Sequence, residues 1–238
     1  MLDWIYPVTC ELCGERSKLP ICDACLNSLP AVPKPICLYC GAPVVGGQDD
    51  AWHCRQCQAR PRSFHFARSA LVNDATVMKL VHDFKYHGAA YLARAFAELL
   101  SRLWEETPEL EAHKDWVLVP IPASGEHLRQ RGYNQAELLA TCLAKLRGLN
   151  VLYPIKHVPT GVSSQTRLAS NARQRNALRS YQAARKRALP PHLLLIDDVY
   201  TTGSTIRACA KVLRRIGGAK VIGALTLLRI VRTSGSLL

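Results

Sequence analysis

The sequence contains no apolar run long enough to cross a membrane. The longest such stretch, Val221–Leu228, has the length of a β-strand, whereas a membrane helix needs about 20 apolar residues. The first ten residues, MLDWIYPVTC, lack the basic start and the long apolar core of a secretory signal. Apolar residues make up 48% of the chain and charged residues 21%, as in ordinary globular proteins, which argues against disorder. We therefore expect a globular cytoplasmic protein that does not insert into a membrane.

Acidic residues are scarce in the second half of the chain. Residues 124–187 contain 12 basic and 2 acidic side chains, whereas residues 1–123 contain 12 and 14, and the whole chain has a formal charge of +13. A basic segment of this kind attracts phosphate groups, on a nucleotide, a pyrophosphate or a nucleic acid, although a solvated basic surface would have the same composition. Tryptophan is scarce as well, and none of the four lies among these arginines, which argues against bases stacked there on tryptophan rings.

Eight of the ten cysteines form four Cys-x-x-Cys pairs within the first 57 residues. Two such pairs complete a closed four-thiolate zinc site, which is typical of structural rather than catalytic zinc. Sequential pairing gives two sites: Cys10, Cys13, Cys22 and Cys25, and Cys37, Cys40, Cys54 and Cys57. Interleaved pairing has compatible spacing and stays open. Disulfides are not expected in a chain without a secretory signal, and we interpret His53 as a surface histidine rather than a ligand.

The chain divides by composition into two regions. Residues 1–62 hold the cysteine pairs and too little apolar mass for a core, so we expect zinc to supply the folding energy of a double zinc ribbon. Residues 63–238 alternate strand-like and amphipathic helical patterns, which favours an α/β fold with a mostly parallel sheet and helices on both faces. We expect strands at 64–72, 116–122, 151–156, 192–197 and 220–227, and helices at 75–86, up to 105, 134–147 and 204–216.

The segment His192–Ile206, HLLLIDDVYTTGSTI, indicates a binding site. An apolar strand leads into Asp197 and Asp198, and a turn rich in hydroxyl groups and glycine precedes the next helix. The carboxyl end of a parallel strand followed by a helix N-terminus favours phosphate binding, because free backbone N–H groups and the helix dipole both attract an anion. Two carboxylates suit the vicinal hydroxyl groups of a ribose. The segment therefore indicates a ribose 5-phosphate group, and the chain contains no Walker-type loop.

This segment resembles the phosphoribosyl-pyrophosphate (PRPP) loop of type I phosphoribosyltransferases. The resemblance implies a type I phosphoribosyltransferase-like fold for residues 63–238, with Asp197 and Asp198 as the catalytic carboxylates that hold the ribose. It implies that the 5-phosphate binds the loop of Thr201, Thr202, Gly203, Ser204 and Thr205. Mg2+ would bind together with PRPP, between the pyrophosphate and the sugar hydroxyl groups.

The chain also resembles the ComF (ComFC/GntX) family in its cysteine pairs and in two further segments, VPIPASGEHLRQRGYNQAELLA (119–140) and SSQTRLASNARQRNALRSY (163–181). This resemblance covers most of the chain and implies a cytoplasmic zinc protein of a family associated with DNA uptake in natural competence and with use of DNA as a nutrient. Whether the uptake serves transformation or nutrition stays open. It implies that the following side chains bind the pyrophosphate or close over it: Arg129, Arg131, Asn134 and Arg175. Arginine suits this role because its planar guanidinium can bind two phosphate oxygens at once. Lys85 matches another basic position of the family.

Three functions stay open at this point. An active transferase would pass the ribose 5-phosphate of PRPP to an unidentified acceptor through an oxocarbenium-like transition state, although Thr201 stands where hypoxanthine-type enzymes carry an acidic residue. A non-catalytic accessory protein would bind single-stranded DNA or a DNA-uptake helicase. An adaptor with an inert second region is disfavoured by the intact loop. We expect a role in DNA uptake with ligand binding at the loop, and the sequence leaves open whether chemistry follows.

Overall fold

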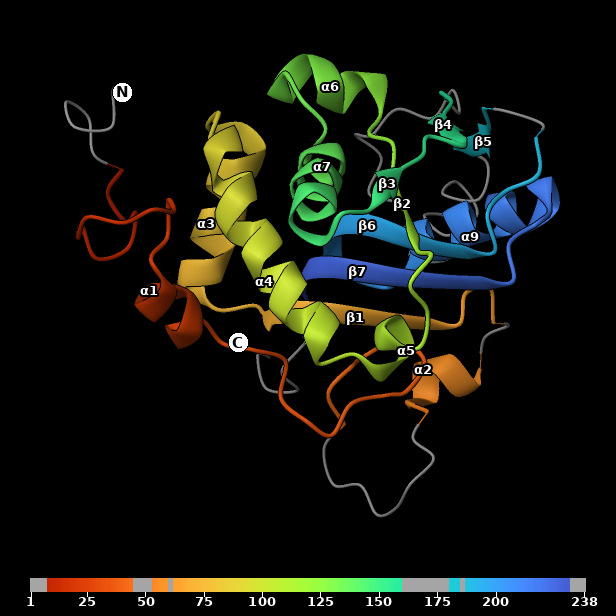
Figure 1. Ribbon diagram of the computed structural model, residues 1–238, viewed down its shortest axis with the longest axis horizontal. Coiled ribbons are helices and arrows are strands. Elements are labelled where there is room, and N and C mark those ends of the chain that lie inside the picture. The colour runs from red at the N-terminus through yellow and green to blue at the C-terminus, as the bar shows by residue number, and fades with distance from the viewer. Residues whose placement is uncertain (1–7, 45–52, 60–61, 160–179, 185–186, 232–238) are drawn as a thin grey trace, which may run out of the picture.

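A computed structural model describes residues 8–44, 53–59, 62–159, 180–184 and 187–231 of the chain, shown in Figure 1. The helices are α1 (Asp23–Ser28), α2 (Arg55–Gln58), α3 (Ala75–Tyr86), α4 (Ala93–Glu105), α5 (Pro108–Glu111), α6 (Gly125–Arg131), α7 (Gln135–Arg147) and α9 (Ser204–Ile216), with a 3-10 turn at Ala90–Leu92. The strands are β1 (Phe66–Val72), β2 (Val117–Pro120), β3 (Asn150–Val151), β4 (Ile155–His157), β5 (Tyr181–Ala183), β6 (His192–Tyr200) and β7 (Val221–Arg229).

A five-stranded sheet in the order β1-β7-β6-β2-β3 forms the centre of the molecule, and all its neighbouring strands are parallel. Side chains alternate between its two faces along β6. Leu194 and Ile196 pack into the core beside α4 and α7, and Leu193 and Leu195 pack into the core beside α9. Figure 1 shows α4 and α7 in front of the sheet and α9 behind it. Burial on both faces explains the unbroken apolar run, and the predicted α/β class is confirmed.

Most of the predicted elements are present, and α3 and α9 have the predicted bounds. The prediction of one strand at 151–156 was wrong, because Pro154 separates β3 of the large sheet from β4, which pairs with β5 in an antiparallel hairpin. Proline has no N–H group to donate to a continuous ladder. Helix α6 was not predicted. It has no buried residue and therefore no apolar period, and its ends are set by the cap of Ser124 and the left-handed Gly132.

The N-terminal region covers the free edge of β1. The backbone N–H of Val72 donates to the carbonyl of Pro30 (2.9 Å), and the N–H of Ala67 donates to the carbonyl of Tyr39 (2.8 Å). An edge strand presents unpaired backbone groups that must be satisfied or protected. The segment from Pro30 to Tyr39 performs this role, and it carries the chain from the core of α3 and α4 to the core of α9 on the other face of the sheet.

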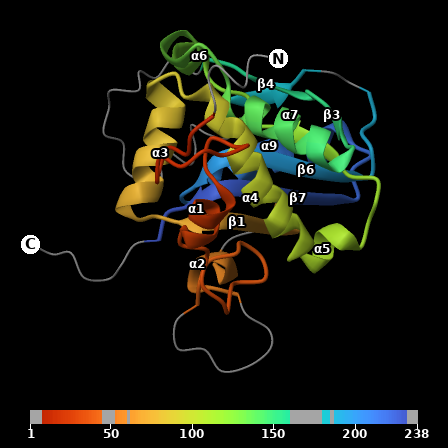
Figure 2. The same ribbon diagram turned by 60° about the vertical axis from the view of Figure 1, so that its left-hand side comes forward.

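The two halves of the cysteine-rich region therefore pack into different cores. Leu26 of the first half joins the core of α3 and α4, and Asp23 of α1 pairs with Arg102 of α4. Figure 2 shows α1 beside α3 and α4. In the second half, Tyr39 stacks on Phe64 with ring centroids 4.4 Å apart, in the core of α9. Each half thus gains from the α/β region the apolar contacts that it lacks by itself.

Candidate functional site

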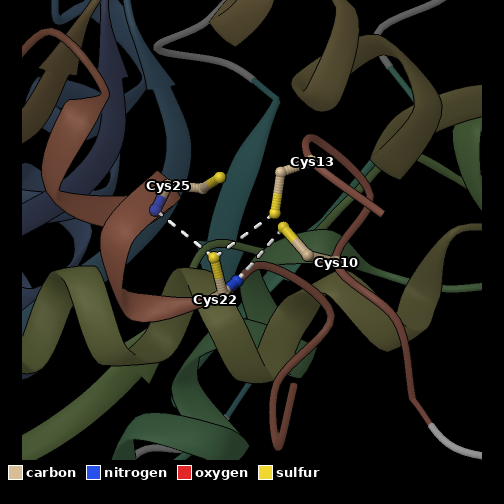
Figure 3. A group of neighbouring side chains, drawn as sticks. All are labelled: Cys10, Cys13, Cys22 and Cys25. Atoms are coloured by element: carbon tan, nitrogen blue, oxygen red, sulfur yellow. Dashed lines mark hydrogen bonds between the residues drawn. The ribbon is translucent and has the colours of Figure 1, made fainter. Parts of the chain in front are cut away.

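The structure brings the N-terminal cysteines together in two groups of four. In each group the four sulfur atoms lie within 4.8 Å of one another. The groups are those of sequential pairing: Cys10, Cys13, Cys22 and Cys25 in the first cluster, and Cys37, Cys40, Cys54 and Cys57 in the second. Figure 3 shows the first cluster, to which a loop and the start of α1 each contribute two thiols. His53 is not part of the second cluster, and its Nε2 lies 2.8 Å from a guanidinium nitrogen of Arg62.

Both clusters suit a zinc ion. The sulfur of Cys10 accepts backbone N–H groups from Cys22 (3.3 Å) and Leu12 (3.5 Å). Burial opposes ionisation of the Cys10 thiol, but these N–H groups together with hydrogen bonds from the backbone and side chain of Cys13 outweigh it and lower its pKa below the ordinary value. In the second cluster the N–H of Cys54 donates to the sulfur of Cys37 (3.3 Å). Four thiolates complete a tetrahedral zinc shell and leave no position for a substrate, so the clusters support structural zinc.

A cavity of about 340 Å³ opens at the carboxyl ends of β2 and β6. Strand β2 stops at Pro120, opposite Ile196, while β6 continues beside β7 as far as Tyr200. After β2 the chain passes through α7 to β3 on one side, and after β6 it passes through α9 to β7 on the other. The two connections thus diverge at this point. Such a switch point in a parallel sheet leaves a crevice, where α/β proteins bind their ligands.

Two carboxylates from β6 line this cavity. Asp198 is paired with Lys85 of α3, with 3.0 Å between Oδ2 and Nζ, and its backbone N–H donates to Oδ1 of Asp197 (3.0 Å). Burial, followed by the charge of Asp198, raises the pKa of Asp197 well above the ordinary value of a carboxyl group, and Lys85 opposes part of that rise. The pair therefore consists of one carboxylate with a lysine partner and one that holds its proton to an unusually high pH.

The loop after β6 and the start of α9 form one wall of the cavity. Thr201 and Thr205 line it, and Gly203 is the N-cap of α9 in the left-handed conformation (φ +68°). The first N–H groups of a helix have no partner within the helix, so this end can bind an anion. The hydroxyl group of Thr202 donates to that of Ser204 (3.2 Å), and neither side chain lines the cavity.

The opposite wall comes from the segment that joins β2 to α7. Arg131 lines the cavity, and its guanidinium donates to Gln135 Oε1 (3.0 Å) and to the Tyr86 hydroxyl (3.1 Å). Asn134 also lines it, but its Oδ1 caps α7 and its Nδ2 donates to the carbonyl of Ile121 (3.1 Å). Asn134 therefore holds the wall together. The free donors are the Nε atom of Arg131 and the Nε2 atom of Gln135, which are buried without a partner among the described residues.

Comparisons with known proteins find matches to the N-terminal region and to most of the chain. The family model of the double zinc ribbon domain matches residues 1–58. The competence protein ComFC of Bacillus subtilis is 28% identical over 216 residues, which cover 88% of this chain and 84% of that protein. The chain is thus similar over most of its length to a competence protein. Competence protein F of Haemophilus influenzae is 28% identical over 219 residues (84% of this chain, 87% of that protein), and the DNA utilization protein YhgH of Escherichia coli K12 is 29% identical over 226 residues (90% and 94%).

Of the other two arginines that the ComF resemblance singled out, the structure describes only Arg129. Arg129 is exposed on α6 and is not among the lining residues, and Arg175 lies outside the described residues.

No helix in the described part of the chain is both long and apolar enough to cross a membrane.

Several residues at the cavity were not predicted: Ser124, His127, Gln135, His157 and Tyr181. Ser124 and His127 belong to the cap and first turn of α6, Gln135 begins α7, and His157 and Tyr181 lie in the β4–β5 hairpin. Four of the five lie within the two segments that carry the ComF resemblance, but no pattern of neighbouring residues singles them out. Desolvation by partial burial lowers the pKa of both histidines, which leaves their imidazoles neutral near pH 7. The site therefore offers neutral bases and an aromatic ring opposite the carboxylates.

Proposed function

We propose that this protein acts in DNA uptake or DNA utilisation, and that it binds PRPP or a related phosphorylated ribose at the cavity between β2 and β6. The names of the relatives, competence protein and DNA utilization protein, support the cellular role. One observation carries the ligand assignment. Asp197 and Asp198 at the end of β6 and the N-terminus of α9 line one cavity at a switch point of the parallel sheet.

Each part of the ligand has a matching group. The carboxylates of Asp197 and Asp198 would accept the two ribose hydroxyl groups, and the start of α9, with Thr201 and Thr205, would hold the 5-phosphate. The wall that carries Arg131 would then face the pyrophosphate. Mg2+ bound together with PRPP would balance the charge of the pyrophosphate. The residues of this chain would bind and orient the sugar.

The same geometry suits displacement of pyrophosphate by an acceptor at the anomeric carbon. The bond from that carbon to the pyrophosphate oxygen would break while the bond to the acceptor forms. The contribution of the protein would be positioning and charge stabilisation. Thr201 cannot take the proton of the acceptor, but the neutral imidazoles of His127 and His157 at the same cavity can.

The test is calorimetric titration of the zinc-loaded full-length protein with PRPP, with and without Mg2+. We expect saturable binding that is lost in the Asp197→Asn/Asp198→Asn double variant, while circular dichroism shows that the variant is folded. Binding of equal strength in the variant would remove the carboxylates from the site. Absence of binding in the native protein would refute PRPP as its ligand.

A second candidate function is binding of single-stranded DNA, alone or with a DNA-uptake helicase. The excess of basic side chains in residues 124–187 favours it, together with the names of the relatives. Fluorescence anisotropy with a labelled oligonucleotide would then show an affinity that falls steeply with salt, because phosphate contacts release counterions. A flat salt response would argue against contacts of this kind. Competition by PRPP would show whether DNA and PRPP share a site.

A further inference from the structure

A buried arginine at the end of β7 contacts the second cysteine cluster. Arg229 is 6% exposed, and its guanidinium donates to the carbonyl of Cys40 (2.6 Å) and to the sulfur of the same residue (3.4 Å). No carboxylate among the described residues forms an ion pair with it. A buried cation is costly without a negative partner. The thiolates of a zinc-filled cluster supply this negative charge, because cysteine binds zinc as a thiolate.

The same arginine contacts the strand that carries the two carboxylates. Its guanidinium carbon lies 4.4 Å from the ring centroid of Tyr200, which is 3% exposed at the end of β6. The residue after Arg229 donates its backbone N–H to the carbonyl of Tyr200 (3.0 Å). Stacking on a cation and pairing through the backbone together hold Tyr200 in one position.

Tyr200 in turn supports the loop at the start of α9. A Cβ atom placed on Gly203 would lie 2.2 Å from the hydroxyl oxygen of Tyr200 and 2.5 Å from its Cζ, so the loop backbone rests directly on this ring. Buried Arg207 of α9 reaches the same loop and donates to the carbonyl of Thr202. The loop that would bind the 5-phosphate therefore packs on the side chain of Tyr200, and the position of Tyr200 in turn depends on Arg229.

A second arginine provides a contrast. Arg68 of β1 is equally buried, and it donates to the carbonyl of Leu38, which lies between Cys37 and Cys40. Its ion pair, however, is with Glu109, and the described contacts of Arg68 do not include Tyr200 or the loop. Both arginines support the same cysteine turn, but only Arg229 connects it to the cavity.

We propose that Arg229 and Tyr200 are positioning residues that couple the second cysteine cluster to the loop of Thr201–Thr205. Zinc in this cluster and a phosphoribosyl ligand in the cavity then each strengthen the binding of the other. This inference rests on the proposed binding of PRPP. Such coupling is reciprocal, because two ligands that favour the same arrangement of the protein must affect each other by the same factor. The first cluster lacks this contact, since it packs against α3 and α4 on the other face of the sheet.

The test measures zinc transfer from the full-length protein to a chromophoric chelator, with and without saturating PRPP and Mg2+. We expect two kinetic phases, one for each cluster, and PRPP should slow one of them about fivefold or more, in the range of ordinary coupling energies. The Asp197→Asn/Asp198→Asn variant, which should not bind PRPP, corrects for any direct effect of PRPP on the chelator. This measurement on the native protein does not depend on the folding of an Arg229 variant.

Two lysine variants then test the route. Arg229→Lys keeps the charge but loses the forked contact with Cys40 and the stacking on Tyr200, and it should weaken PRPP binding about tenfold and abolish the slowing of zinc transfer. Arg68→Lys, the matched control, should leave both unchanged.

The outcomes separate the two proposals. If PRPP binds the native protein by calorimetry but changes neither phase of zinc transfer, the coupling is refuted and the proposed function stands. If Arg68→Lys has the same effect as Arg229→Lys, the route through Arg229 is wrong. If PRPP does not bind at all, the proposed function fails and the coupling fails with it.

Discussion

The Asp197→Asn substitution tests the electrostatics and the chemistry of the cavity together. The amide keeps the Oδ1 acceptor for the backbone N–H of Asp198, so the local backbone should not change. At a pH above the raised pKa of Asp197, where the titration is to be carried out, it removes the negative charge that would accept a ribose hydroxyl group. A hydrogen bond to a charged group is worth about 1.5–3 kcal/mol, and calorimetry should therefore show PRPP binding weakened about 10- to 150-fold.

The Asp197→Asn substitution weakens PRPP binding, but at high pH it should increase the free energy of unfolding relative to the native protein. Because burial raises the pKa of Asp197, the folded state binds this proton more tightly than the unfolded chain does. Its contribution to stability is therefore fully present below the ordinary pKa of the carboxyl and is lost as the pH rises through the raised pKa, by up to about 1.4 kcal/mol per pH unit. The asparagine variant lacks this loss, so its free energy of unfolding relative to the native protein should increase with pH.

Urea unfolding at several pH values from about 6 upward measures this difference while the zinc clusters stay filled. Asp115→Asn is the matched control, because Asp115 lies at the amino end of the sheet and pairs with His192 (2.7 Å between Oδ1 and Nδ1). It should leave PRPP affinity unchanged. An Asp197→Asn variant that binds PRPP as well as the native protein, or that loses stability with pH in parallel with it, would refute the reasoning.

Three further results are expected. Lys85→Met leaves the nearly buried carboxylate of Asp198 without its partner and should cost about 1–3 kcal/mol in urea unfolding; equal stability would show that the pair contributes nothing. Gly203→Ala should abolish ligand binding in calorimetry because its Cβ would collide with Tyr200. The control Gly148→Ala, at a similar positive φ with open space around it, should bind the ligand normally. Normal binding by both variants would contradict the tight contact between Gly203 and Tyr200. Elemental analysis should find about two zinc ions per chain, and circular dichroism should show loss of structure on chelation; a metal-free folded protein would exclude structural zinc.

The sequence predicted those parts of the molecule that depend on neighbours along the chain. The spacing of two residues within each cysteine pair sets two thiolates on one turn, and sequential pairing is what the structure shows. The run from Leu193 to Thr205 contains a buried strand, two carboxylates and a helix start in consecutive positions, so both α9 and its place after β6 could be predicted. Local periodicity likewise gave the bounds of α3.

The cavity itself was decided by the tertiary structure. Lys85 reaches Asp198 from a helix more than a hundred positions earlier, and His157 and Tyr181 reach the same space from a hairpin that Pro154 separates from β3. None of these side chains lies in a repeating pattern, because each contributes one contact rather than one face of an element. Sheet order, which depends on long-range pairing, determined that the connections after β2 and β6 diverge beside the carboxylates.

The contacts between the cysteine-rich region and the α/β region show most clearly which features are local in the sequence and which depend on the fold. Composition alone separated a cysteine-rich segment from an α/β segment, since cysteine spacing and apolar period are local properties. The fold places one cluster on each face of the sheet and sets Arg229 on Cys40, a residue 189 positions away. That contact exists because β7 pairs with β1, whose edge the N-terminal segment covers. Such proximity follows from strand pairing in three dimensions, which no pattern of neighbouring residues contains.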